Sequence, residues 1–154
     1  MSSPSGKYFA PKPGRFGKQV VFLVGPAGVG AAATFTASDT TVFDVPTPFR
    51  KLYFEKAAAH ARTVPAFSAA GASGIGVATV FRVRAGTSTA ITASLTLDTL
   101  ASTVTSFTIL AAASANAFYV AEGDNFEVQV SMGTATVTTA AADLTFVIEA
   151  SVLE

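Results

Sequence analysis

Apolar and polar residues alternate along several stretches of the chain with a period of two. The alternation is clean over residues 51–55, 91–98 and 126–131, and it continues over residues 144–152 except at Val147. A period of two places one set of side chains on a buried face and the other on a solvent face, which is typical of a half-buried strand. Further candidate strands lie at residues 20–24, 32–37, 41–45, 77–84 and 104–110.

These short strands, separated by turn residues, predict an all-β protein. The richness in threonine and valine agrees with this, because both residues favour strands. We therefore expect a jelly-roll-like antiparallel β-sandwich. The apolar faces of the strands predict its core, which should contain Leu52, Phe54, Phe81, Val83, Ile91, Leu95, Leu97, Phe126, Val128, Val130, Leu144, Phe146 and Ile148.

The first 18 residues differ from the rest of the chain. They are rich in Pro, Gly and Ser, which do not sustain a helix or a central strand, and they carry bases but no acid. We expect residues 1–18 to form an extended basic arm and residues 19–154 to form a single β-sandwich domain. Within this domain, residues 57–76 contain two alanine clusters, Pro65 and three glycines. They predict a long loop, in which residues 57–62 could form one helical turn.

Composition narrows the classes of function. Half of the 154 residues are hydrophobic and 13% are charged, which excludes an intrinsically disordered chain. The absence of cysteine excludes a disulfide scaffold, a thiolate zinc site and a cysteine nucleophile. No stretch approaches the roughly 20 apolar residues of a membrane span. Residues 20–24 are also too short for the apolar region of a secretory signal.

The charges are divided unevenly along the chain. All ten bases lie between Lys7 and Arg84 together with three acids, and the other seven acids follow Arg84. The two parts therefore carry formal charges of +7 and −7, although their sum is zero. Such asymmetry favours self-association or docking on charged neighbours, unless the folded surface mixes both signs. The balanced total gives no support for nucleic-acid binding.

Two places in the first half of the chain resemble sites of chemistry. Residues 20–30 look like the opening of a phosphate-binding loop, but Ala31 and Ala32 stand where that loop needs Lys and Ser or Thr. His60 is the only imidazole, and no serine has the flanking glycines of a nucleophile elbow. We therefore expect no catalytic residues, no cofactor and no enzymatic activity.

Acidic residues cluster once, in the segment from Glu122 to Asn125. This segment offers three oxygen-bearing side chains, whereas calcium takes six to eight oxygen ligands. A turn that leads into the next strand explains Gly123, Asp124 and Asn125 equally well. We expect no metal site, while a cation held by Glu122 and Asp124 stays open as an alternative.

Residues 118–128 read FYVAEGDNFEV, a turn followed by a strand. In a β-rich chain without cysteine, this element resembles the small jelly-roll proteins of tailed-phage virions, which include head decoration (cement) proteins and head fibres. The resemblance covers roughly residues 45–154. It implies a non-enzymatic bacteriophage protein at the capsid surface of the virion. Such a protein would be a trimer that binds the major capsid protein and stabilises the capsid lattice.

Two other classes of function remain open beside this one. A carbohydrate- or receptor-binding module of a phage tail or fibre could use the same sandwich. Sugar-binding surfaces usually carry exposed Trp or Tyr, and the chain has no Trp and three Tyr. A hydrolase has no supporting group of residues. We expect neither a nucleic acid nor a membrane as a partner.

The candidate partner-binding residues lie in the basic arm. Its four bases are three to five residues apart, and aromatic side chains stand between them. At about 3.3 Å per residue, an extended segment of this length reaches up to about 60 Å, which is enough to cross onto a neighbouring subunit. An acidic capsid surface would attract it. The expected contact residues are Lys7, Tyr8, Phe9, Lys12, Arg15, Phe16 and Lys18.

Overall fold

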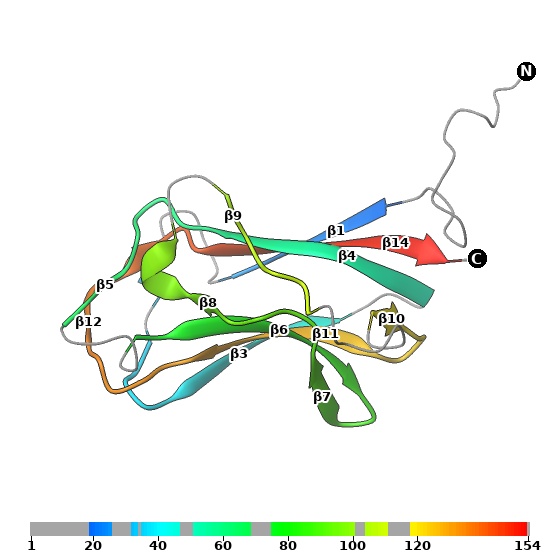
Figure 1. The fold of residues 1–154 in the computed structure, drawn as a ribbon, viewed down its shortest axis with the longest axis horizontal. Helices are drawn as coiled ribbons and strands as arrows, with labels where there is room; N and C mark the ends of the chain where they lie inside the picture. Colours follow the sequence, from blue (N-terminus) through cyan, green and yellow to red (C-terminus); the bar gives the residue numbers. More distant parts are fainter. Residues whose placement is uncertain are drawn as a thin grey trace, which may run out of the picture.

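Two antiparallel β-sheets pack face to face in the computed structural model (Figure 1). The structure describes residues 19–25, 32–33, 35–46, 51–68, 75–100, 104–110 and 118–153. The first sheet has the strand order β1 (Gln19–Val24), β14 (Thr145–Leu153), β4 (Lys51–His60) and β10 (Tyr119–Val120), and β9 (Thr105–Ser106) also pairs with β4. The second sheet has the order β3 (Thr40–Pro46), β11 (Asn125–Ser131), β6 (Val77–Arg84) and β7 (Thr87–Ala90), and β8 (Leu95–Thr96) also pairs with β6.

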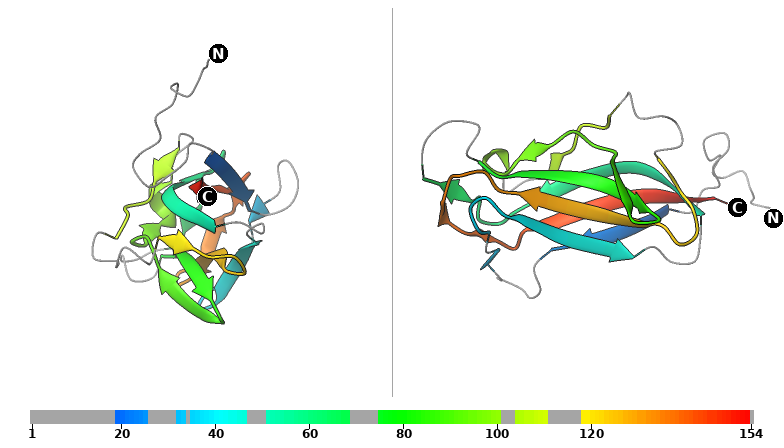
Figure 2. Two further views of the ribbon diagram at one scale, coloured as in Figure 1. Left: turned by 90° about the vertical axis from the view of Figure 1, so that its right-hand side faces the viewer. Right: turned by 90° about the horizontal axis from the view of Figure 1, so that it is seen from below.

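The order of the strands is that of a jelly roll. Along the chain, β1, β3, β4 and β6 fall alternately in the first and second sheets, β7 forms a hairpin with β6, and β10, β11 and β14 alternate again. The eight strands of the two main paths, connected in this way, form two Greek keys folded together. The predicted all-β, jelly-roll-like sandwich is thus confirmed, and Figure 2 presents its two layers from the end and from below.

Two short strand pairs complete the structure at its edges. β2 (Ala32–Ala33) pairs with β13 (Ala141–Ala142), and β5 (Ala66–Phe67) pairs with β12 (Val137–Thr139). In the described part of the chain, no helix is long and apolar enough to cross a membrane.

The core lies between the two sheets. Phe126 of β11 has no exposed surface, and its ring centroid lies 5.9 Å from that of Phe22 and 6.0 Å from that of Phe54, so aromatic contacts join the sheets. Leu95 is half-buried against this core. Most of the other predicted core residues are fully buried, namely Leu52, Phe54, Ile91, Leu97, Phe126, Val128, Val130, Leu144, Phe146 and Ile148.

The predicted faces of β6 are wrong. Val80 points into the core, whereas Phe81 and Val83, both predicted core residues, lie half-buried on the outer face. Arg82 and Arg84 follow on the inward side, at the end of the strand, where oxygen atoms of the segment before β11 accept their hydrogen bonds. Locally, the sequence Phe-Arg-Val-Arg favours the opposite orientation, but the tertiary partners of the arginines decide it.

Residues 57–60, predicted as part of a long loop, instead extend β4 to ten residues. A β-bulge lies in the middle of this strand, because successive residues of β14 pair with Lys56 and then with Phe54, which leaves Glu55 as the extra residue. Before the bulge the even-numbered residues of β4 are buried, and after it the odd-numbered ones are. Because the buried positions change from even to odd at the bulge, residues 51–60 do not show one continuous period of two, and the sequence did not predict the alanine cluster as part of the strand.

Three other predicted strands are shorter than expected. Residues 91–98 contain only β8 and the start of a 3₁₀ turn at Leu97–Thr99. Thr92 explains the interruption, since its hydroxyl accepts a hydrogen bond from the backbone N–H of Val80 at 3.0 Å and so takes the place of a strand partner. Among the described residues of 32–37 and 104–110, the strands are the two-residue β2 and β9.

Candidate functional site

The predicted contact residues of the arm, Lys7 to Lys18, lie outside the described residues. The first described residue, Gln19, pairs with Ser151 near the end of β14. β1 therefore begins at the end of the sandwich where β14 finishes, as Figure 1 shows.

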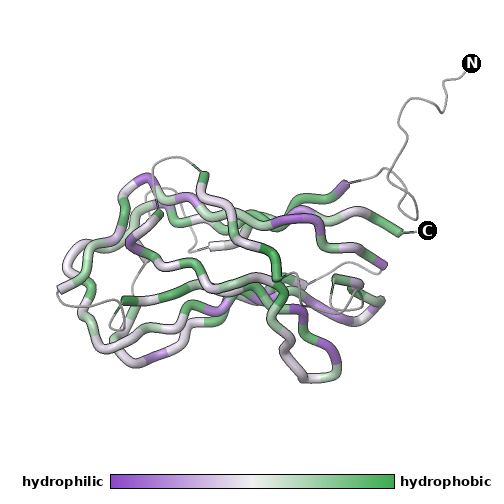
Figure 3. The backbone as a smooth tube through the Cα atoms, viewed as in Figure 1, coloured by the Kyte–Doolittle hydropathy of each residue, from purple (hydrophilic) through white to green (hydrophobic). Residues whose placement is uncertain are grey.

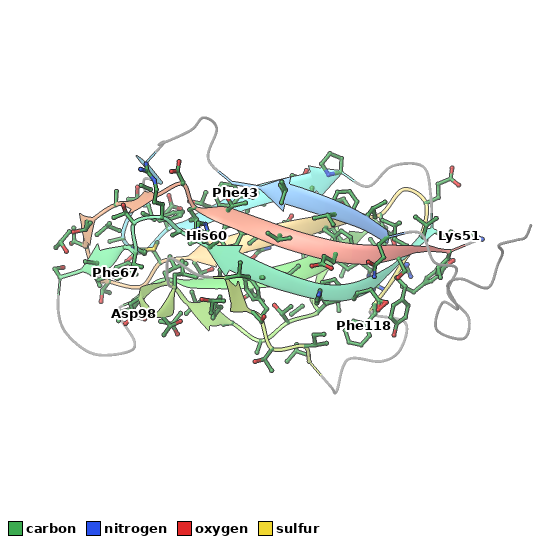
Figure 4. The ribbon with its side chains drawn as sticks, turned by 90° about the horizontal axis from the view of Figure 1, so that it is seen from above. Phe43, Lys51, His60, Phe67, Asp98 and Phe118 are labelled. Atoms are coloured by element: carbon green, nitrogen blue, oxygen red, sulfur yellow. The ribbon has the colours of Figure 1, made fainter. Side chains whose placement is uncertain are left out.

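An apolar stripe crosses the outer face of the first sheet at β1. It consists of Val21 and Leu23 of β1, Val147 of β14 and Ala58 of β4; Leu23 pairs with Val147, which pairs with Ala58. Val21 and Leu23 are 56% and 70% exposed, which is unusual for side chains of this size. Hydrophobic colouring covers most of β1 in Figure 3, and Figure 4 looks onto this face, with Lys51 and His60 near the two ends of β4.

An ion pair borders the apolar stripe. Val21 lies opposite Glu149, whose Oε1 is 3.5 Å from Nζ of Lys56 on the next strand. The lysine is largely exposed and the glutamate partly so, and an ion pair at the surface contributes little to stability. Along the strands, the outer face is apolar at the row of Leu23, Val147 and Ala58, and it becomes charged at the row that contains Glu149 and Lys56.

The stripe was missed at the level of the sequence, although a signal was present. Residues 20–24 are apolar at every position, whereas a strand with one solvent face should alternate. A strand that is apolar on both sides is typical of a strand covered on both sides. In the structure, Val20 and Phe22 pack against the core and the outer side chains of β1 are exposed.

The candidate cation site is a turn closed by Asp124. Gly123 has a φ of +91°, a conformation that favours glycine. The N–H of Asp124 donates to the carbonyl oxygen of Ala121 at 3.1 Å, and the Asp124 Oδ2 accepts from the N–H of Ala121 at 2.8 Å. The carboxylate thus holds the turn between β10 and β11 in place.

Arg84 binds the same carboxylate from β6. Its Nε donates to both carboxylate oxygens of Asp124, at 3.1 and 2.9 Å, and its Nη2 donates to Oδ2 at 2.6 Å. The Nη2 also donates to the carbonyl oxygen of Tyr119 at 3.2 Å. Arg84 therefore fixes both β10 and the start of β11 to β6. Asp124 thus has a structural role in the turn–strand element of residues 118–128.

The electrostatics of this cluster favour the ionised carboxylate. Burial by itself raises the pKa of Asp124, but the hydrogen bonds from Arg84 and Ala121 and the charges of Arg84 and Arg82 outweigh it, so that the pKa lies below its ordinary value of 3.8. The hydrogen bond to Asp124 raises the pKa of Arg84. Burial and the neighbouring Arg84 lower the pKa of Arg82.

The other residues considered for chemistry have places in the sandwich. His60 lies at the end of β4, opposite Thr145, and not in a loop. Gly25 follows β1 where a Cβ atom would overlap the carbonyl oxygen of Leu144, so this glycine allows a close backbone approach. Residues 26–30 of the glycine-rich run lie outside the described residues. Within the described ranges, no three His, Asp or Glu side chains come together as a metal site.

The outer face of the second sheet mixes acidic and polar side chains with the apolar Val42, Phe81 and Val83. Asp44 of β3 accepts a hydrogen bond from the side-chain amide of Asn125, and Glu127 accepts one from Gln129 at the neighbouring position of β11. The two arginines of this sheet are on its inward side, so they do not neutralise these carboxylates on the outer face. This face differs from the apolar stripe of the first sheet.

Two tyrosines lie next to each other at the end of the first sheet. Tyr53 and Tyr119 are opposite one another on neighbouring strands, and both are half-buried. The ring of Phe118 lies 6.2 Å from that of Tyr53 and 6.1 Å from that of Phe54. Phe118 therefore packs against both Tyr53 and the core residue Phe54. Because the two tyrosines are half-buried, they do not form the open aromatic platform that would favour sugar binding.

Comparison with protein-family models, with curated proteins and with solved structures finds no match.

Proposed function

We propose that the protein is a non-enzymatic structural protein of a virion, which binds the major capsid protein and stabilises the capsid lattice. The observation that carries this proposal is the position of β1. An exposed apolar strand lies directly after the basic residues 1–18, at one end of a sandwich. Basic and apolar binding groups are therefore continuous in the chain.

The charges of the arm suit an extended contact with an acidic surface. Lys7, Lys12, Arg15 and Lys18 carry no neighbouring acid before Asp39. The prolines between them reduce the entropy that the segment loses when it is fixed on a partner. Attachment of this kind weakens as salt concentration rises, because the contacts are between exposed charges.

The charged groups that pair within the sandwich serve its structure. Arg84 holds Asp124 across two strands, and Arg62 donates to the carboxylate of Asp143 at 2.6 Å. These pairs connect segments that are about 40 and 80 residues apart in the chain, so they tie distant parts of the sandwich together. A rigid sandwich on one capsid subunit and an extended arm on a neighbouring subunit would together bridge the two subunits.

The proposal is tested on capsid particles that lack this protein. Addition of the purified chain should raise the temperature at which the particles release their DNA, as followed with a dye that fluoresces on DNA. A Lys12→Gln/Arg15→Gln variant should protect less, whereas a Lys51→Gln/Lys56→Gln variant, which loses the same charge from exposed positions of the sandwich, should protect like the natural chain. If a saturating amount of protein leaves the release temperature unchanged, the proposal is wrong.

A further inference from the structure

We infer that the edge of β1 opposite β14 is a self-association surface, on which a second copy of the chain pairs antiparallel through its own β1. The first sheets of the two copies would then form one continuous sheet across a two-fold axis. This inference goes beyond the proposed function and does not depend on it. It rests on the edges of the two sheets and on the sequence of β1.

The other sheet edges are protected against pairing. β3, at one edge of the second sheet, carries the charged Asp44 and ends at Pro46, and both residue types block the addition of a strand. At the remaining edges, β7 has four residues and β10 has two. Strands this short offer few backbone groups to a partner.

β1 has none of these protections. It is six residues long and contains neither a charged residue nor a proline. One side of it pairs with β14, and no backbone hydrogen bond joins its other side to any residue in the described part of the chain. An exposed, regular and hydrophobic edge strand is a template for pairing with another chain.

The sequence of β1 is complementary to itself. When two copies pair antiparallel with Phe22 opposite Phe22, Val21 of each copy lies opposite Leu23 of the other. Both outward pairs are then apolar, and no charges oppose each other. The apolar stripe continues from one copy into the other, so that the exposed surface of Val21 and Leu23 is reduced.

Two-fold pairing gives a dimer, whereas the resemblance to head decoration proteins implies a trimer. The two expectations differ in the mass of the protein in solution. We assign the edge to a second copy because the antiparallel pairing of two β1 strands places apolar residues opposite each other at every outward position and brings no charges together.

The first experiment measures the mass of the full chain by sedimentation equilibrium over a range of concentrations. We expect a dimer for the natural chain, and a dissociation constant at least about tenfold higher for Val21→Lys/Leu23→Lys, because lysines oppose edge pairing and these exposed positions leave the core intact. Val42→Lys is the control, since Val42 is 49% exposed on the edge strand of the other sheet, and it should stay dimeric. A monomer, a trimer, or an equal effect of the control overturns the inference.

The second experiment tests the register. The chain has no cysteine, so Val21→Cys and Leu23→Cys each introduce a single thiol. Directly opposite residues have Cα atoms about 4.5–5.5 Å apart, which suits a disulfide. A mixture of the two variants should therefore oxidise to the mixed disulfide faster than either variant alone. Faster formation of either homodimer, or equal cross-linking of Val42→Cys, overturns the register.

Discussion

At the scale of single residues, Asp124 does most to hold the sandwich at one end. Its carboxylate is nearly buried, closes the turn before β11 and binds Arg84 of β6. A sequence can suggest the turn, because Gly-Asp-Asn is typical of one, but it does not show that Arg84 is the partner of Asp124. The two residues are 40 positions apart and meet only in the folded chain.

Replacement of this carboxylate should lower stability in a pH-dependent way. Because the pKa of Asp124 is below 3.8 in the folded state, its stabilisation is complete above that value and is lost as the pH falls through the folded pKa. In urea unfolding at neutral pH, Asp124→Asn should cost about 1–3 kcal/mol. The difference between the natural chain and the variant should shrink as the pH falls below about 4.

Glu122 provides the control for this prediction, because it is an exposed acid in the same turn. Glu122→Gln should change the free energy of unfolding by less than about 0.5 kcal/mol at neutral pH. Equal effects of the two substitutions would contradict the structural role of Asp124. A loss of stability in Asp124→Asn that stays constant down to low pH would contradict it too.

At the scale of elements, the faces of the strands decide which residues matter. β11 keeps a regular period of two and β14 keeps it up to Ala150, and the sequence predicts these buried faces correctly, although Ser151 on the predicted polar face is buried as well. β6 and β4 do not, for different reasons. In β6 the arginines have partners in another part of the fold, and in β4 the extra residue Glu55 exchanges the two faces. Neither cause is visible in a local pattern.

The faces of β11 and β6 are tested by the same substitution at two phenylalanines. Phe126→Ala should cost roughly 3–5 kcal/mol, because the ring is fully buried between the sheets. Phe81→Ala should cost at most about 1.5 kcal/mol, because that ring is half-buried on the outer face. Chemical unfolding measures both values, and a greater loss for Phe81→Ala than for Phe126→Ala would reverse the assigned faces.

β1 shows what a sequence pattern leaves open at this scale. Its uninterrupted apolar run predicts a strand, and the structure confirms one at Gln19–Val24. A run that is apolar at every position is also typical of a strand whose two faces are both buried against other parts of a protein. The sequence alone does not say that β1 lies at a sheet edge, because the pairing with β14 joins residues about 130 positions apart.

At the scale of the whole molecule, an edge strand of the jelly roll with two exposed apolar side chains directly follows the basic segment in the chain. Val21 and Leu23 of β1 are these side chains, and residues 1–18 before the strand carry four of the ten bases. The opposite sheet presents Asp44 and Glu127 on its outer face. The sequence predicted the sandwich correctly, but the arrangement of these surfaces required the strand order.

The most direct test of this account compares the binding of the full chain and of residues 19–154 to capsid particles that lack the protein. Cosedimentation at increasing protein concentration gives the dissociation constant of each, and thermal unfolding checks that the shortened chain still folds. We predict that the shortened chain unfolds at the same temperature but binds at least about tenfold more weakly, because the charged contacts of the arm are lost. Undiminished binding by the shortened chain would show that the sandwich alone makes the contact and would contradict the account.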